Sequence, residues 1–209
     1  MFSLQTIFGK GDKFYGLLEQ SADAARESAR AVHKLVSPGG GSPDIAAFSV
    51  ARKREKDLAQ QISEELVNTF VTALDREDIE ALNAALYKIP KTVEKFAERY
   101  AMISDRLHGI DFTQRTELLV RASDVVREMI GQLRKGMRVD AMRRLQDRLQ
   151  ALESEADRLL LEPYREMYVN STDPVRMVLA KDLYELLERA IDKCRDVGNV
   201  TYSIVLKNS

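Results

Sequence analysis

Apolar residues recur at steps of three and four along most of the chain, which is the spacing of helices that bury one face. Glycine and proline are too few and too scattered to punctuate a series of strands. The pattern predicts an all-α fold of about six helices, over residues 12–36, 44–70, 75–103, 112–135, 139–169 and 173–205. The strongest breaks between them fall at 37–43, 108–111 and 170–173. Pro90 lies inside the third helix, and we expect it to bend that helix rather than end it.

The last three predicted helices repeat the order of the first three. Asp57 and Asp157 take matching places in the middle helices, and Asp75 and Asp173 are matching candidates for helix N-caps. The offset is therefore close to one hundred residues, which suggests an internal repeat. We expect one domain over residues 1–209, with one three-helix repeat at 12–109 and another at 110–209, packed as an elongated bundle.

Charge and composition argue against several classes of binding partner and cellular location. The 32 basic and 33 acidic residues leave a net charge of -1, which argues against binding of nucleic acid or of an anionic membrane. The single cysteine cannot form an internal disulfide, and the first eight residues are too short and too polar for a signal peptide. No apolar run reaches the ~18 residues of a membrane span. The sequence predicts a cytoplasmic protein with no direct membrane insertion.

An unusual pair of acids stands out in the stretch LQALESEADRLLLEP, residues 149–163. Glu153 and Asp157 are four residues apart, and neither has a basic residue three or four positions away. Like charges at this spacing destabilise an isolated helix. Glu155, in contrast, has Arg158 three residues on and is typical of an ordinary surface acid.

The last predicted helix contains a second pair, Glu188 and Asp192, and Glu185 and Asp196 extend the same strip. Both pairs border the apolar seam of their helix. If the two helices pack through those seams, Glu153, Asp157, Glu188 and Asp192 converge, and such a group of hard oxygen ligands suits a divalent or trivalent metal ion. A salt-bridged surface is the competing interpretation, and spacing alone favours it, because Asp192 has Arg189 and Arg195 three residues to either side.

Three segments carry a resemblance to a known family: FVTALDREDIEAL at 70–82, LESEAD at 152–157 and LYELLERAIDKCRDVGN at 183–199. In this order they resemble the PhoU family, in particular its Pit-accessory branch of phosphate transport regulators. The resemblance implies two three-helix repeats and a non-enzymatic regulator that acts at the inner membrane through a Pit-type phosphate transporter.

The resemblance also implies Glu-x-x-x-Asp motifs that hold iron or zinc in some members. The second repeat matches them at Glu153, Asp157, Glu188 and Asp192. The first repeat departs from them, because Lys53 stands four residues before Asp57 and because Tyr87 and Lys91 replace the acids of the third helix. An ion pair between Lys53 and Asp57 would balance that charge without a metal.

Two alternatives remain open. A ferritin-like di-iron enzyme needs a Glu-x-x-His motif, but Arg30 precedes His33 and Asp105 precedes His108 at that spacing. A purely structural helical scaffold is the other alternative, and a homo-oligomer is compatible with any of these interpretations.

Overall fold

The computed structural model describes residues 4–38, 45–136, 138–170 and 173–209. Over these residues it contains no strand, and its helices are α1 (Leu4–Val36), α2 (Ile45–Asn68), α3 (Arg76–Ile103), a one-turn 3-10 helix (Ser104–Arg106), α4 (Thr113–Arg134), α5 (Val139–Asn170) and α6 (Pro174–Lys207). The all-α prediction is confirmed. The predicted break at 108–111 is also confirmed, whereas 39–43 and 171–172 in the other two breaks lie outside the described residues.

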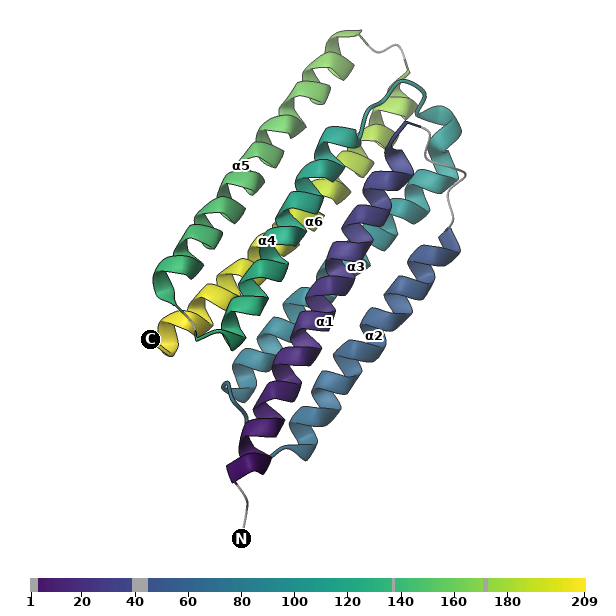
Figure 1. The fold of residues 1–209 in the computed structure, drawn as a ribbon. Coiled ribbons are helices and arrows are strands. Elements are labelled where there is room, and N and C mark those ends of the chain that lie inside the picture. Colours follow the sequence, from purple (N-terminus) through teal and green to yellow (C-terminus); the bar gives the residue numbers. More distant parts are fainter. Residues whose placement is uncertain (1–3, 39–44, 137, 171–172) are drawn as a thin grey trace.

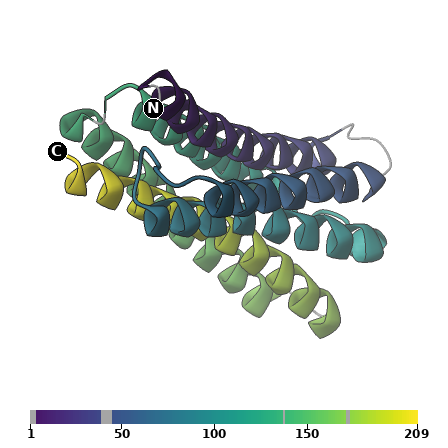
Figure 2. The ribbon, with the colours of Figure 1, turned by 90° about the horizontal axis from the view of Figure 1, so that it is seen from below.

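The six helices run side by side as an elongated bundle (Figure 1). Helices α1, α3, α4 and α6 form its centre, where α1 packs against α4 and α3 packs against α6. Helix α2 flanks α1 and α3 on one edge, and α5 flanks α4 and α6 on the other. Seen from below, the helices again run alongside one another (Figure 2). None of the helices, over their described residues, is long and apolar enough to cross a membrane.

Aromatic side chains join the two halves of the bundle where α3 ends and α4 begins. The ring of Phe112 lies 5.7 Å from that of Phe96 in α3 and 4.9 Å from that of Tyr184 in α6, measured between ring centroids. Phe96 and Phe112 are almost completely buried. Aromatic rings bury large apolar areas, so this cluster fixes α3, α4 and α6 against one another.

The two predicted N-caps behave differently. The Asp173 carboxylate accepts hydrogen bonds from the backbone N–H groups of Val175 and Arg176, each at 3.0 Å, at the start of α6. Asp75 occupies the cap position of α3 but makes no side-chain cap hydrogen bond. Helix α3 continues through Pro90 to Ile103, as predicted from the periodicity on both sides of the proline. Sequence located both helix starts, although the capping interaction forms at one of them.

Helix α6 packs closely against α5 at Gly198. A Cβ atom at this position would lie 2.5 Å from the Leu149 side chain and 2.8 Å from that of Gln146. Real Cβ atoms do not approach other atoms so closely, so the contact between α5 and α6 depends on a glycine here.

Candidate functional site

Three of the four predicted acids interact where α5 packs against α6. The pKa of Glu188 is raised to about 7, first by burial and then by the charge of Asp192, a hydrogen bond between these two carboxyl groups and the charge of Asp157. Arg189 has a weaker opposing effect. A hydrogen bond between two carboxyl groups needs a proton on one of them. The surroundings of Glu188 therefore favour the protonated form of this side chain.

The fourth acid, Glu153, does not join this group as a free carboxylate. Arg195 of α6 reaches across to α5 and forms an ion pair with it, and the Glu153 side chain is only 13% exposed. Sequence spacing showed no basic neighbour for Glu153 on its own helix, and its partner comes from the other helix. From its spacing, Arg195 was a candidate partner of Asp192 on the same helix. The antiparallel register of α5 and α6 places Arg195 opposite Glu153 instead.

The acids that flank the cluster have partners on their own helix. Glu185 pairs with Lys181 and, at 3.4 Å, with Arg189. Asp196 pairs with Lys193 at 2.8 Å. Within the described part of the chain, no ion pair forms at Asp157 or Asp192. The interpretation as a salt-bridged surface therefore holds for Glu185 and Asp196 at the two ends of the acidic strip. Asp192, between them, and Asp157 on α5 keep no ion-pair partner among the described residues.

A metal site in this cluster depends on where the acidic side chains lie. The carboxyl groups of Asp157, Glu188 and Asp192 supply the hard oxygen atoms that divalent cations prefer. However, over the described residues no three acidic, histidine or cysteine side chains stand close enough to hold a metal ion. Glu153 is paired with Arg195, and the raised pKa of Glu188 favours its neutral form. The donor types fit a metal, but their arrangement in this structure does not.

The first repeat contains an ion pair of opposite polarity at the corresponding place. Arg52 of α2 lies 3.5 Å from Glu94 of α3, and its guanidinium stacks over the Tyr87 ring at 3.8 Å from the centroid. Arg52 and Glu94 precede Glu153 and Arg195 by the same number of residues. Each repeat thus links its second and third helices with one ion pair, but the acid and the base exchange helices.

The pair that sequence proposed for the first repeat is absent. Over the described residues Lys53 and Asp57 form no ion pair, and both side chains are exposed. The ion pair of Arg52 was not predicted from the sequence, because the segment RKREK at 52–56 contains several basic residues. Periodicity alone does not say which of them faces α3.

Known proteins were compared with the chain in three ways. No family model matches it. It is 26% identical over 151 residues to the UPF0111 protein YkaA of Bacillus subtilis, covering 69% of this chain and 70% of that protein. It is 22% identical over 209 residues to a candidate pit accessory protein of Rhizobium meliloti, covering 97% of this chain and 96% of that protein.

Solved structures decide the fold. Two Shewanella oneidensis MR-1 proteins, one described as PhoU-like and one as a candidate PhoU-like phosphate regulatory protein, match with TM-scores of 0.78 and 0.79 at 16% and 17% identity. Each match covers 93% of this chain and 99% of the other. The fold is PhoU-like. PhoU from Pseudomonas aeruginosa matches with a TM-score of 0.61 at 15% identity, over 99% of this chain and 98% of that one. The predicted resemblance to the PhoU family and its Pit-accessory branch is confirmed.

A buried acid in the PhoU-like bundle was not predicted. Glu55 of α2 is fully buried, and burial raises its pKa to about 7 although Arg52 and Arg54 lower it in part. The Ser21 hydroxyl of α1 donates a hydrogen bond to one Glu55 oxygen at 2.9 Å, and the other oxygen has no partner. The signal was present in the sequence, because Glu55 lies three residues before Leu58 and seven before Ile62, on their apolar face.

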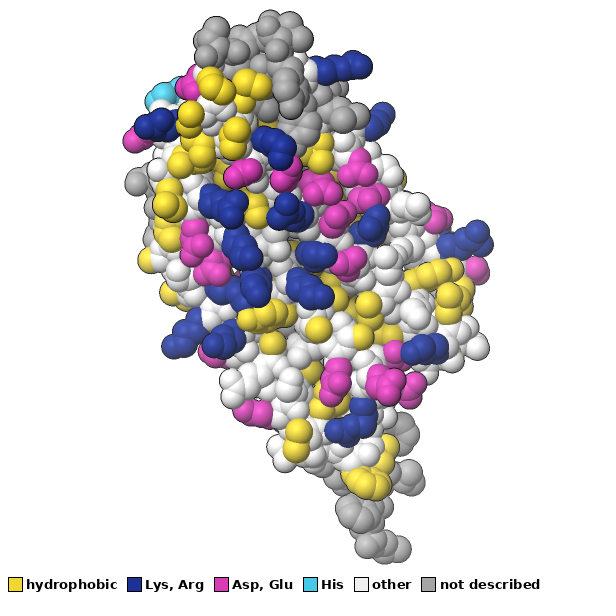
Figure 3. Space-filling view, turned by 180° about the vertical axis from the view of Figure 1, so that it is seen from behind, with side chains coloured by type: hydrophobic (Ala, Val, Ile, Leu, Met, Phe, Trp, Pro, Cys, Tyr) yellow, Lys and Arg dark blue, Asp and Glu magenta, His cyan; other side chains and the backbone are white. Residues whose placement is uncertain are grey.

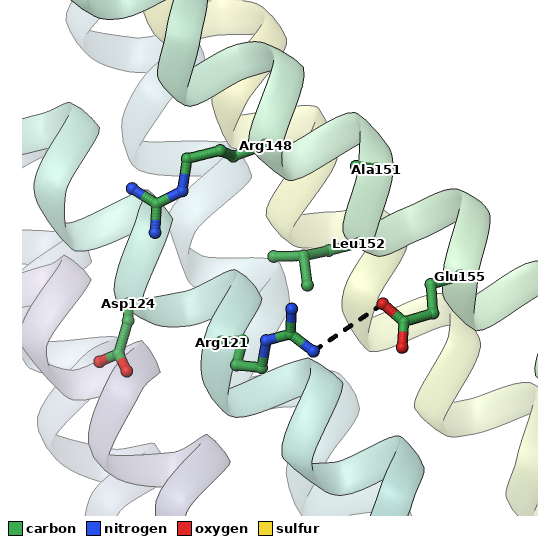
Figure 4. A pocket seen from close by; sticks show the side chains of 6 residues that line it. All are labelled: Arg121, Asp124, Arg148, Ala151, Leu152 and Glu155. Carbon is green, nitrogen blue, oxygen red and sulfur yellow. Dashed lines mark ion pairs between the residues drawn. The ribbon is translucent and has the colours of Figure 1, made fainter.

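A cavity of about 270 Å³ lies between α4 and α5, on another side of α5. Arg121 and Arg148 extend toward it, with Leu152 between them (Figure 4). Arg121 pairs with Glu155 at 3.8 Å, although sequence had assigned Arg158 to that acid, and Arg148 pairs with Glu128 at 3.3 Å. Acids therefore balance both arginines, and the cavity presents no strong field to an anion.

Proposed function

We propose that this protein is a cytoplasmic, non-enzymatic accessory protein that regulates a Pit-type inorganic phosphate transporter. The observation that carries the proposal is a PhoU-like fold over 93% of the chain. The similarity to a candidate pit accessory protein, which extends over 97% of the chain, points to the same role. Regulation then requires contact with the transporter and no chemical step in the bundle itself.

A ferritin-like di-iron enzyme fits the side chains less well. The ring Nδ1 of His33 lies 2.9 Å from the Thr116 hydroxyl oxygen, between α1 and α4. Arg30, which stands where a Glu-x-x-His motif needs its acid, pairs with Asp124 at 3.0 Å. A di-iron site of this type needs the acid and the histidine together.

The regulatory proposal can be tested by phosphate uptake. Cells that express the transporter with and without this protein should take up radiolabelled phosphate at different rates, and the protein should co-purify with the transporter in mild detergent. Equal uptake rates together with no co-purification would overturn the proposal.

We also propose that the second repeat binds a divalent or trivalent metal, iron or zinc first among them, through Glu153, Asp157, Glu188 and Asp192. The proposal rests on the acids that remain uncompensated at the centre of the strip. Metal binding would require Glu153 to leave Arg195 and Glu188 to lose its proton, because metal ligands must be deprotonated.

This requirement gives a sharp metal-binding experiment. Asp157→Asn with Asp192→Asn should remove bound metal, whereas Asp57→Asn in the first repeat should leave metal content unchanged. Arg195→Gln should strengthen binding, because it frees Glu153 and removes a positive charge. Elemental analysis after incubation with iron, zinc, manganese or magnesium measures each result, and circular dichroism confirms folding. No uptake by the parent protein, or loss of uptake in Asp57→Asn, would refute the assignment.

A further inference from the structure

Exposed lysines gather on the outer face of α2 and α3. They are spaced three residues apart on α2 and three and four apart on α3, so each row follows one side of its helix. None of them forms an ion pair over the described residues. The space-filling view from behind shows Lys and Arg side chains clustered on this face (Figure 3). We name it the lysine face, made of Lys53, Lys56, Lys88, Lys91 and Lys95.

The acids on these stretches do not cancel the lysine charge. Glu94 is engaged by Arg52, so that pair is neutral. Asp57 and Glu98 are exposed on the same stretches, which leaves an excess of positive charge. The chain as a whole carries a net charge of -1, so the positive charge is segregated rather than absent. A segregated patch attracts anions even when the whole protein is nearly neutral.

Exposed apolar side chains lie at one end of the lysine face. Met102, at the end of α3, is 82% exposed, and Val50, near the start of the antiparallel helix α2, is 69% exposed. Val175 and Val178 at the start of α6 are more than half exposed as well. The Arg99–Asp182 ion pair at 3.9 Å places this part of α6 beside the end of α3. Lysines and apolar side chains thus occupy neighbouring parts of one face.

We propose that the lysine face binds the anionic phospholipid headgroups of a membrane surface, with Met102 and its apolar neighbours entering the headgroup layer. Basic side chains beside exposed apolar ones are the combination by which proteins bind a membrane interface without spanning it. A nucleic acid fits less well, because single-stranded recognition needs free aromatic rings and Arg52 covers the ring of Tyr87. The inference goes beyond the proposed function, since it needs no transporter.

Vesicle binding tests the proposal with the full-length protein alone. The parent should sediment with vesicles of phosphatidylcholine and phosphatidylglycerol, not with phosphatidylcholine alone, and high salt should release it. Lys53→Gln with Lys91→Gln and Lys95→Gln should weaken partitioning about 100-fold. The matched control is Lys135→Gln with Arg143→Gln and Arg144→Gln, which changes the net charge equally at exposed positions elsewhere. It should bind like the parent.

A tryptophan reporter tests the orientation, because the sequence contains no tryptophan. Emission from Met102→Trp should shift to shorter wavelength when anionic vesicles are added. Phe70 is 98% exposed in the turn between α2 and α3, at the opposite end of those helices, and Phe70→Trp should give no shift.

Four results would overturn the proposal: no sedimentation of the parent with anionic vesicles, equal weakening by both triple variants, a shift in the reporter at Phe70 but not at Met102, or binding to single-stranded DNA as tight as to vesicles. Circular dichroism of each variant checks that its helices are retained. The transporter is absent from every measurement, so a failure here leaves the regulatory proposal to its own uptake experiment.

Discussion

Replacement of the buried acid Glu55 by glutamine should flatten the pH dependence of stability. The pKa of Glu55 rises from 4.5 to about 7 on folding, chiefly because the side chain is buried. Between these values the folded state holds a proton that the unfolded state has lost. Stability therefore falls as pH rises through this window, and the loss is complete above the folded pKa.

The magnitude follows from the two pKa values. One pKa unit corresponds to about 1.4 kcal/mol, so ionisation of Glu55 costs the folded state roughly 3 kcal/mol at pH 8 relative to pH 4. In Glu55→Gln the amide oxygen can still accept the Ser21 hydrogen bond, and the side chain carries no charge at any pH. A cost for its extra N–H group would be the same at every pH.

Urea unfolding followed by circular dichroism, at several values between pH 4 and pH 8, measures this difference. Glu188 contributes a slope of the same sign, so Glu55→Gln should reduce the fall in the free energy of unfolding rather than remove it. Glu64→Gln is the matched control, because Glu64 is exposed on the same helix. If Glu55→Gln and the parent lose stability equally between pH 4 and pH 8, the ionisation of Glu55 does not limit stability.

Two matched pairs of variants test the packing and the caps through the free energy of unfolding. Gly198→Ala should destabilise the protein by about 1 to 3 kcal/mol, because its Cβ would overlap the side chain of Leu149. Gly131→Ala should stabilise it by about 0.5 kcal/mol, because the new Cβ meets only the far end of the Arg127 side chain and alanine favours the helix. Equal effects of the two substitutions would contradict this packing. Asp173→Ala should cost about 1 kcal/mol through loss of its two cap hydrogen bonds, and Asp75→Ala, at a cap without a side-chain hydrogen bond, should cost less; the reverse order would refute the cap assignment.

Sequence predicted the helices well because their signals are local. Apolar periodicity located all six, and the carboxylate of Asp173 can satisfy backbone N–H groups at the start of a helix wherever that helix packs. The first helix was the main error in extent, since α1 begins at Leu4 and not near Asp12. The segment before Asp12 has a less regular apolar pattern, so periodicity gave a weak signal there.

The candidate site could be predicted only in part, because ion pairs between helices depend on register. Periodicity brought Glu153, Asp157, Glu188 and Asp192 to one seam, but it did not show that Arg195 stands opposite Glu153. A shift of one helical turn would have given Arg195 a different partner. The net charge of the chain could not predict the lysine face either, because it gives the sum of the charges and not their positions on the surface.

The two three-helix halves of the chain present different charged surfaces. Ion pairs at matching positions, Arg52–Glu94 and Glu153–Arg195, link the second and third helices of each half with opposite polarity. The charges around each pair face solvent, so they can diverge with little effect on the buried core. One half then keeps acids suited to a cation, and the other collects lysines suited to an anionic surface. If both proposals hold, the ligands would bind to different repeats, and the contact between α3 and α6 would be the physical connection through which one site could influence the other.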